Sequence, residues 1–396
     1  MTNPCWEQHI ADDLASLRQS HLYRQRQLTF AIDATHVERD GRRLINFASN
    51  DYLGLTRDPS VIAAATAAAW RYGTGSGAAP LISGYGPAHE SAERAICQWK
   101  RCEAAILFPS GYQANHAAIQ TAAHVGKLHG GVRFLIDKLA HASLIDAIRG
   151  SGEEFRVFPH NHIDKLRRLL SEHPPAQLQV LVTESIFSMD GDAADLRALA
   201  QLKREHEFLL VLDEAHASGV YGAAGEGLAA EMGVSDAVDV SVLTFSKALG
   251  CIGAAVCGSD HFCQALINHA RAYLFSTSIP PMVAAAADAA IAVIRDDPSR
   301  RQRLRELARL VRERINEMGL SIPGGDSPII PIILGDESAA LEAAQIMQDR
   351  GMLVGAVRPP TVARGSSRLR VTLSSEHTDQ DIQQFLAALT AIRAPQ

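Results

Sequence analysis

The sequence predicts an α/β protein with a mostly parallel, seven-stranded sheet between helices, followed by a smaller C-terminal α/β domain. Between about residues 100 and 258, short β-branched runs alternate with longer segments of helical periodicity. After Pro281 the pattern changes to two long helical segments and then to shorter strands and helices. Alternating strands and helices are typical of a parallel sheet that helices cover on both faces.

The elements are expected in the following order. An amphipathic helix at roughly residues 5–28 precedes a short strand at 44–49. The seven strands of the large sheet are expected at residues 104–108, 132–136, 155–158, 178–184, 208–212, 238–243 and 254–258. The C-terminal part is expected to hold helices at 281–295 and 299–318, a strand at 329–334, a helix ending near 350, a strand at 368–373 and a helix at 378–393. We therefore expect an N-terminal helical segment (1–45), a large domain (46–285) and a small C-terminal domain (286–396).

Composition excludes several classes of protein. The chain of 396 residues is 47% hydrophobic and 21% charged, as is usual for a globular protein. A net charge of −6 gives no electrostatic reason to expect a nucleic acid or a membrane as partner. The charged N-terminus does not resemble a secretory signal, and the six cysteines show no CxxC spacing. We expect a cytoplasmic protein with reduced thiols and no metal site.

Polar residues follow five of the expected strands. In open parallel sheets, ligands bind beyond the carboxyl ends of the strands, so these residues are expected to share one edge. They are Ser110, His141, Ser188, Asp213, His216, Thr244, Ser246 and Lys247. Their joint placement predicts a single polar site.

Asp213 and Lys247 suggest what that site binds. Asp213 ends a buried strand, where its carboxylate could form an ion pair, cap the next turn, or face a protonated ring nitrogen. At about 4 Å and an effective dielectric constant near 20, the last arrangement is worth roughly 4 kcal/mol, or about three pKa units. A partly desolvated Lys247 can form a Schiff base with an aldehyde. A pyridine that carries an aldehyde and a phosphate is pyridoxal 5'-phosphate (PLP), and Ser110-Gly111-Tyr112 opens a helix that could bind the phosphate.

The segment LLVLDEAHASGVYG (209–222), followed by TFSKALG (244–250), resembles the α-oxoamine synthase family of fold-type-I PLP enzymes. SNDYLGL (49–55), TESIFSMDGD (183–192) and FSTSIPP (275–281) fit the same family, in collinear order over roughly residues 10–393. The resemblance implies a homodimer with a shared active site. It also implies condensation of an amino acid with an acyl-CoA or acyl-carrier thioester, and the RPPTV run (358–362) resembles the biotin-pathway branch, which uses L-alanine and a pimeloyl thioester.

The resemblance also implies a role for each candidate residue. Lys247 would hold PLP covalently and move the substrate proton, while Asp213 would face the ring nitrogen. His141 would stack on the ring, unless it only caps a helix, and His216 and Ser188 would contact the phenolic oxygen. The phosphate would be bound by Ser110, Gly111, Tyr112, Thr244 and Ser246, and by Thr277 of the other subunit. Substrate would be bound by Arg24, Asn50, Thr361 and Arg370, with Arg370 on the amino-acid carboxylate and Arg24 and Thr361 on the acyl group.

Several alternatives stay open. Residues 78–80 read Ala-Ala-Pro and position 363 is Ala, which departs from the family pattern. These departures allow a sister enzyme that uses glycine with acetyl-CoA or succinyl-CoA, or another amino acid with a longer acyl-CoA. A PLP aminotransferase or lyase of the same fold is another alternative. A nucleotide-dependent protein built on the DEAH run (213–216) lacks a GxxxxGK[ST] loop. HNH (160–162) is expected to be a surface loop, and Arg368 a surface ion pair.

Overall fold

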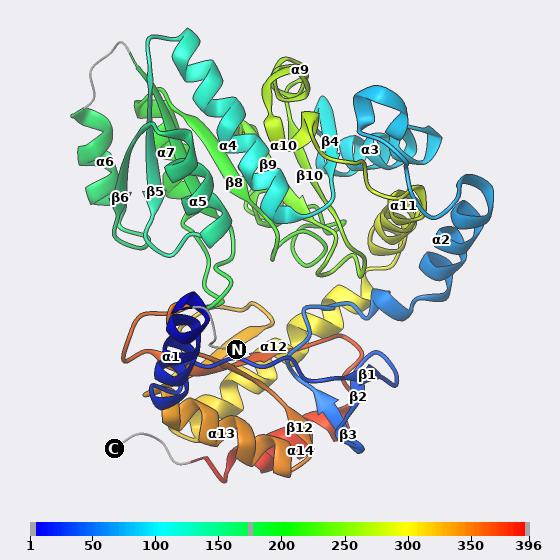
Figure 1. Ribbon diagram of the computed structural model, residues 1–396, viewed down its shortest axis with the longest axis vertical. Helices are drawn as coiled ribbons and strands as arrows, with labels where there is room; N and C mark the ends of the chain where they lie inside the picture. The colour runs from blue at the N-terminus through cyan, green and yellow to red at the C-terminus, as the bar shows by residue number, and fades with distance from the viewer. Residues whose placement is uncertain (1–4, 173–176, 393–396) are drawn as a thin grey trace. The chain divides into compact units, whose positions relative to one another are not determined.

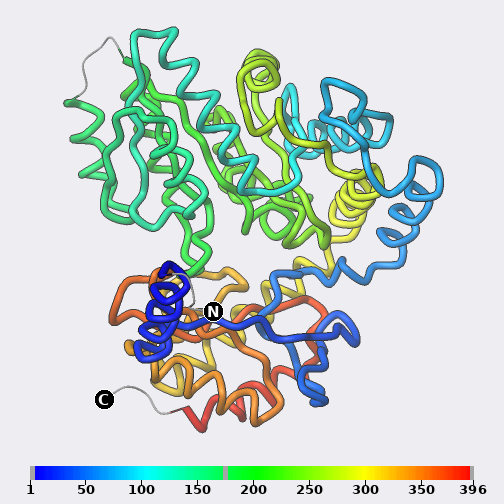
Figure 2. Tube along the Cα trace, in the orientation of Figure 1, coloured from blue at the N-terminus to red at the C-terminus, as the bar shows by residue number. Residues whose placement is uncertain are grey.

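A computed structural model describes residues 5–172 and 177–392. The chain forms two compact units. Unit 1 comprises the described residues within 1–49, 189–191 and 305–396, and unit 2 comprises those within 50–188 and 192–304. Figure 2 shows that unit 1 takes its residues mainly from the two ends of the chain, and unit 2 from the middle. None of the described helices is long and apolar enough to cross a membrane.

Unit 2 is built on a seven-stranded sheet with the order β4-β10-β9-β8-β7-β5-β6. Its strands are β4 (Ala104–Phe108), β5 (Val132–Asp137), β6 (Glu154–Phe158), β7 (Leu178–Glu184), β8 (Leu209–Asp213), β9 (Val240–Thr244) and β10 (Ala254–Gly258). Only β10 runs antiparallel to its neighbours. The predicted mostly parallel, seven-stranded α/β sheet is therefore confirmed, and the carboxyl ends of the other six strands share one edge.

The sheet of unit 2 is accompanied by α-helices in the described part of the chain. They are α2 (Pro59–Tyr72), α3 (Pro87–Lys100), α4 (Gly111–Leu128), α5 (Ala142–Ser151), α6 (Ile163–Ser171), α7 (Leu196–Glu205), α8 (Leu228–Glu231), α9 (Asp260–His269), α10 (Arg271–Leu274) and α11 (Pro281–Asp296). The alanine-rich face of α4 packs with α5, α9 and α10 on one face of the sheet, against alternate apolar residues such as Phe134 and Val182 (Figure 1). The side chains that alternate with these and point to the other face of the sheet, such as Leu135 and Leu181, are also buried. Burial on both faces explains why these strands are nearly continuous apolar runs.

Unit 1 contains two smaller sheets. One has the order β1-β2-β3-β12, from β1 (Phe30–Ala31), β2 (His36–Arg39), β3 (Arg42–Asn46) and β12 (Met352–Leu353). The other has the order β11-β14-β13, from β11 (Ile329–Gly335), β14 (Ser367–Thr372) and β13 (Gly355–Val357). Its helices are α1 (Cys5–Gln19), α13 (Glu337–Asp349) and α14 (Asp379–Leu389), while α12 (Ser299–Glu317) continues the chain from unit 2 into unit 1.

Two expectations were wrong. The first helix ends at Gln19 rather than near residue 28, and His21 has the left-handed φ of 57° that such a helix cannot continue through. The HNH segment is the expected loop before a helix, between β6 and α6, but His160 within it is only 24% exposed and forms ion pairs with Asp137 and Asp192. Arg368 is also buried rather than at the surface, and its Nη1 lies 2.7 Å from Asp190 Oδ1. Residue 393, at the end of the expected last helix, lies outside the described residues.

Candidate functional site

The start of α4 forms a concave, donor-rich corner at the carboxyl edge of the sheet. Ser110 caps the helix, and its Oγ accepts a hydrogen bond from the amide of Gln113 at 3.3 Å. A Cβ at Gly111 would lie 2.5 Å from Thr244 Cγ2, so only glycine lets the helix start this close to the end of β9. The free amides at the start of this 18-residue helix, beside the Thr244 hydroxyl, suit an anion such as a phosphate.

Asp213 is the fixed negative charge of the site. It is buried at the end of β8, where Oδ1 accepts the amide of Ala215 at 2.8 Å and Oδ2 accepts Nδ2 of Asn115 at 2.8 Å. Asn115 in turn contacts Ser143 Oγ at 2.9 Å. These donors hold the carboxylate in one orientation and compensate its burial.

Lys247 lies just after β9, half-buried, with Nζ 3.2 Å from Thr244 Oγ1. The charges of Lys247 and Asp213 both act on the pKa of His141, so both groups lie near its imidazole. Desolvation lowers the pKa of His141, the positive charge of Lys247 adds to this effect, and the carboxylate of Asp213 opposes it. The net effect favours the neutral imidazole.

His141 also begins α5. Its Nδ1 accepts the amide of Ser143 at 3.2 Å and lies 2.7 Å from Ser143 Oγ, so the alternative role of helix cap is present in the structure. The cap fixes the direction of the imidazole but leaves the side chain exposed. Capping and stacking on a ligand are therefore compatible roles.

His216 and Ser188 are both buried in unit 2. His216 Nδ1 lies 2.6 Å from the hydroxyl of Tyr52, which is itself fully buried. Tyr52 Oη also contacts Asn50 Oδ1 at 3.5 Å. The contact with Tyr52 therefore fixes the orientation of the His216 imidazole.

Glu184 is an unexpected member of the site. It ends β7 in register with Asp213 on β8, and burial, followed by repulsion from Asp213, raises its pKa well above the ordinary range. The backbone amides of His141 and Ser188 donate to its carboxyl group, and Lys247 partly offsets the shift. Glu184 Oε1 has no hydrogen-bond partner in the part of the chain that the structure describes.

The remaining candidates of unit 2 lie at its surface. Ser246 and Thr277 are exposed, and the exposed Tyr112 donates its hydroxyl to Asp146 Oδ2 at 2.8 Å. The Tyr112 side chain thus points to a neighbouring helix residue, which leaves its backbone amide as the group at the start of α4.

Unit 1 contains the other three candidates. Arg370 is buried on β14, and its Nη1 donates to Thr372 Oγ1 at 3.1 Å. Arg24 and Thr361 are exposed, and Arg24 Nη2 donates to the carbonyl of Pro359 at 3.0 Å. These contacts hold the RPPTV run against the segment that follows α1.

Beside Arg24 lies a second arginine that the sequence did not single out. Arg358 is 8% exposed, and its Nη1 donates to the carbonyl of His21. Its pKa is lowered by burial and by Arg24, while Glu337 acts in the opposite direction. Arg358 Nε lacks a hydrogen-bond partner among the described residues. Two adjacent guanidinium groups with a spare donor suit a carboxylate.

Four residues of the candidate site were not singled out from the sequence: Asn115, Glu184, Tyr52 and Arg358. Asn115 is one helical turn beyond Gly111, so the spacing of α4 could have suggested it. Glu184 ends a core strand next to Asp213, which is the signal that identified Asp213 itself. Tyr52 stands in the SNDYLGL run, but only the fold shows that it contacts His216.

The residues present fit PLP. The α4 start with Thr244 suits its phosphate, Asp213 its ring nitrogen and Lys247 its aldehyde. Asn115 Oδ1 and Glu184 Oε1 are buried acceptors without partners among the described residues, as expected where a polar ligand completes a site. A cavity of about 650 Å³ in unit 2, lined by residues such as Trp99 and Asp239, contains none of the predicted site residues, so the chemistry rather than the cavity locates the site. The described residues offer no group of three or more His, Cys, Asp or Glu side chains that could hold a metal ion.

Comparisons with known proteins agree with this chemistry. Residues 42–389 match the family described as Aminotransferase class I and II. An 8-amino-7-oxononanoate synthase from Anaeromyxobacter dehalogenans is 45% identical over 90% of this chain and 88% of its own length. A serine palmitoyltransferase from S. paucimobilis with bound PLP and myriocin has a TM-score of 0.91 at 28% identity, covering 98% of this chain and 99% of its own. An 8-amino-7-oxononanoate synthase from Francisella tularensis has a TM-score of 0.76 at 26% identity, covering 88% of this chain and 97% of its own.

The chain therefore belongs to the aminotransferase class I and II family and has its fold-type-I architecture. PLP is its cofactor. Within the family it is an α-oxoamine synthase, a PLP-dependent transferase that joins an amino acid to an acyl group.

Proposed function

We propose that this chain acts as an 8-amino-7-oxononanoate synthase of biotin biosynthesis. It would condense L-alanine with pimeloyl-CoA, or with the corresponding carrier-protein thioester, and release CO2 and the thiol. The names of the similar sequences support this reaction. The observation that carries the proposal is the Arg24–Arg358 pair, because a pimeloyl group ends in a carboxylate and a palmitoyl or acetyl group does not.

The residues of unit 2 would divide the work at the cofactor. PLP, when bound, supplies an electron sink for the carbanion that forms at Cα of the amino acid. Lys247 would hold it covalently between turnovers, and its released amine would take the Cα proton and later return one. Asp213, fixed by Asn115 and the Ala215 amide, would keep the ring nitrogen protonated.

Other residues would orient the reactants. The start of α4 and Thr244 would bind the phosphate, and Thr277 would contribute from the second subunit. His216, oriented by Tyr52, and Ser188 would contact the phenolic oxygen, with His141 against the ring. Arg370 and Asn50 would bind the carboxylate of alanine, and Arg24, Arg358 and Thr361 would bind the acyl group. Holding both substrates at fixed positions removes much of the entropy cost of their encounter.

We also infer that the protein works as a cytoplasmic homodimer. Large apolar side chains are exposed on unit 2, including Trp70 (89%), Ile82 (80%) and Phe275 (72%). Exposed apolar groups of this size typically become covered by a protein partner. Phe275 is two residues from Thr277, which is proposed to act across the dimer. Light scattering of the purified protein tests the dimer directly.

A substrate panel tests the acyl specificity. Initial rates of thiol release would be measured with L-alanine and pimeloyl-CoA, its ω-methyl ester, succinyl-CoA, acetyl-CoA or palmitoyl-CoA, and again with glycine or L-serine. Pimeloyl-CoA should exceed its methyl ester in kcat/KM by about 10- to 100-fold, as expected for a charged hydrogen-bonded pair. That ratio should collapse in Arg24→Gln and Arg358→Gln but persist in the matched control Arg26→Gln.

Two outcomes would contradict the proposal. Equal rates with the acid and its ester would remove the role of the arginine pair. Preference for glycine with acetyl-CoA or succinyl-CoA, or for serine with palmitoyl-CoA, would instead identify a sister enzyme of the same family.

A further inference from the structure

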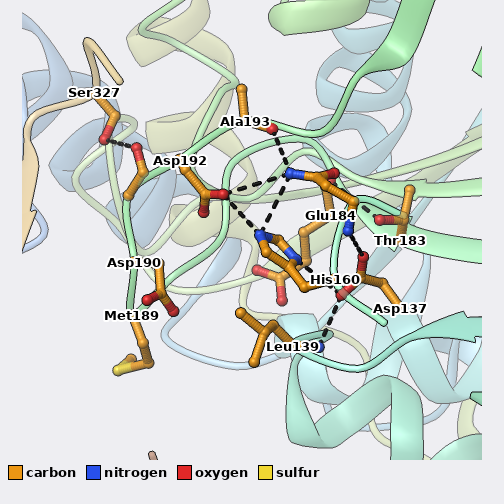
Figure 3. A network of polar contacts seen from close by, with 12 residues as sticks. Asp137, Leu139, His160, Thr183, Glu184, Met189, Asp190, Asp192, Ala193 and Ser327 are labelled. Carbon is orange, nitrogen blue, oxygen red and sulfur yellow. Dashed lines mark hydrogen bonds and ion pairs between the residues drawn. The ribbon is translucent and has the colours of Figure 1, made fainter. Parts of the chain in front are cut away.

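His160 bridges two carboxylates in unit 2. It lies between β6 and α6, with Nδ1 3.0 Å from Asp137 Oδ1 and Nε2 2.7 Å from Asp192 Oδ2, as Figure 3 shows. A histidine whose two ring nitrogens both face carboxylates must donate from both, so it is in the cationic form. The edge of its ring also packs against Phe187, with the centroids 4.4 Å apart and the planes at 88°.

Asp137 controls the turn that leads to His141. It is the last residue of β5 and is 1% exposed. Its Oδ1 accepts the amide of Leu139 at 2.8 Å, and its backbone carbonyl accepts the amide of Ala140 at 3.1 Å. The carboxylate of Asp137 therefore shapes the residues that position the imidazole of His141.

Asp192 controls the turn that carries Ser188. Its carbonyl accepts the amide of Phe187 at 2.9 Å, and Ile186 pairs with Ala193 in an isolated antiparallel bridge. Asn161, next to His160, donates from Nδ2 to the carbonyl of Ala193 at 2.9 Å and from its backbone amide to Asp137 Oδ2 at 3.0 Å. The His160-Asn161 pair thus holds the ends of both turns.

Glu184 makes a second link between the turn of His141 and the turn of Ser188. Its carboxyl group accepts the backbone amides of His141 and Ser188. The two turns are therefore joined twice, once by Glu184 and once by His160. A rotation of either turn would break contacts at both places.

We infer that His160 is a positioning residue, which joins the turn of His141 to the turn of Ser188 and so fixes both side chains for PLP. This inference rests on the proposed roles of His141 and Ser188 at the cofactor, but not on the identity of the acyl substrate. It explains why an HNH run in a connecting segment has two acidic partners that lie far from it in the sequence.

The charge state supports this role over the whole neutral range. Burial opposes protonation of His160, but the hydrogen bonds to Asp137 and Asp192 outweigh it and raise its pKa to about 10. Asp137 and Asp192 are the charged side chains in hydrogen-bond contact with the ring among the described residues. A pKa of about 10 keeps the imidazole cationic across the neutral range.

The test compares His160→Gln with His162→Gln, a matched control two residues away. His162 is exposed, and its Nδ1 only caps α6 by accepting the amide of Lys165 at 3.2 Å. The readouts are the dissociation constant of PLP, hydrogen exchange of the apoprotein and holoenzyme, and the pH titration of the visible absorbance of the bound cofactor. None of these depends on the acyl substrate, so a wrong substrate assignment would leave them unaffected.

His160→Gln should weaken PLP binding by about 10-fold or more, as expected when a charged hydrogen bond is lost. Exchange should rise in residues 138–142 and 185–193 but stay unchanged in β8 and β9, and the absorbance titration should shift. His162→Gln should match the wild type. Unchanged binding and exchange in His160→Gln would overturn the inference, as would a general loss of protection across the sheet, which would indicate a purely structural role.

A second measurement covers a variant that does not fold. In the wild-type protein with 15N-labelled histidine, both ring nitrogens of His160 should remain protonated at pH 8. A neutral imidazole at pH 8 would overturn the inference regardless of how the variant behaves. The milder variant Asp192→Asn keeps the shape of the contact, and it should loosen residues 185–193 more than residues 138–142.

Discussion

Lys100 forms a buried ion pair with Glu214, the residue after Asp213, and its removal is the sharpest stability test in unit 2. Lys100 Nζ lies 2.6 Å from Glu214 Oε2, and both side chains are 4% exposed. Nζ also donates to Ser218 Oγ at 3.1 Å and to the carbonyl of Glu226. Glu214 follows Asp213 in the chain, so the pair holds the end of β8.

The expected effect of Lys100→Met follows from what it leaves behind. The Glu214 carboxylate would still accept hydrogen bonds, such as the one from the amide of Ala229, which lies 3.0 Å from Oε1. It would, however, be a buried negative charge that has lost its Lys100 cation. Breaking a buried pair by removing one partner costs about 3–5 kcal/mol. For a unit of this size, that corresponds to a fall in Tm of about 6 to 20 °C.

Differential scanning calorimetry and urea unfolding of the holoenzyme measure this loss. The matched control is Lys203→Met, because Lys203 pairs with Asp239 where the side chains are 20% and 39% exposed, and an exposed pair is worth about 0–1 kcal/mol. The double variant Lys100→Met/Glu214→Gln removes the stranded charge and should recover part of the stability. Lys100→Met should not lose as little free energy of unfolding as Lys203→Met, and such a result would contradict the role of the buried pair. The same holds if the double variant is less stable than Lys100→Met by the whole loss that Glu214→Gln causes on its own.

Two further predictions concern charge. His377 is buried against Phe47, and burial lowers its pKa to about 4, with Asp381 acting in the opposite direction. A histidine with a folded pKa below its unfolded value of 6.5 stabilises the protein above pH 6.5 and loses that stability as the pH falls through 4. Unfolding free energies between pH 7 and 4 should therefore fall more steeply for the wild type than for His377→Phe, and parallel slopes would argue against this. Asp213→Asn keeps the shape of the side chain but removes its charge. Deprotonation of L-alanine, measured as exchange of its Cα hydrogen in 2H2O, should therefore slow by at least about 100-fold, which is the equivalent of two pKa units at the ring nitrogen. An unchanged rate would place the essential charge elsewhere.

The large sheet was predictable because its strands are buried on both faces. Apolar runs such as 104–108 and 254–258 predict buried strands, and the structure has strands at these same residues. The end of the first helix was not predictable from periodicity, since α1 buries no residue and nothing in its pattern marks Gln19 as the last helical position.

The candidate site could be predicted only where residues follow strand ends. Asp213 and Thr244 end β8 and β9, and Lys247 follows shortly after. Asn115 lies on a helix, and Tyr52 precedes α2 by several residues, so their contacts with Asp213 and His216 exist only once the chain has folded. His160 shows the same limit most clearly, because its two partners come from other strands and turns and its own neighbours carry no apolar pattern.

The most direct test of the account is the product formed from L-alanine and pimeloyl-CoA by the PLP-loaded enzyme, analysed by mass spectrometry. The account predicts 8-amino-7-oxononanoate together with CO2 and free CoA thiol in equal amounts. Thiol release without an amino ketone, or transfer of the amino group to a keto acid with no thiol released, would contradict it.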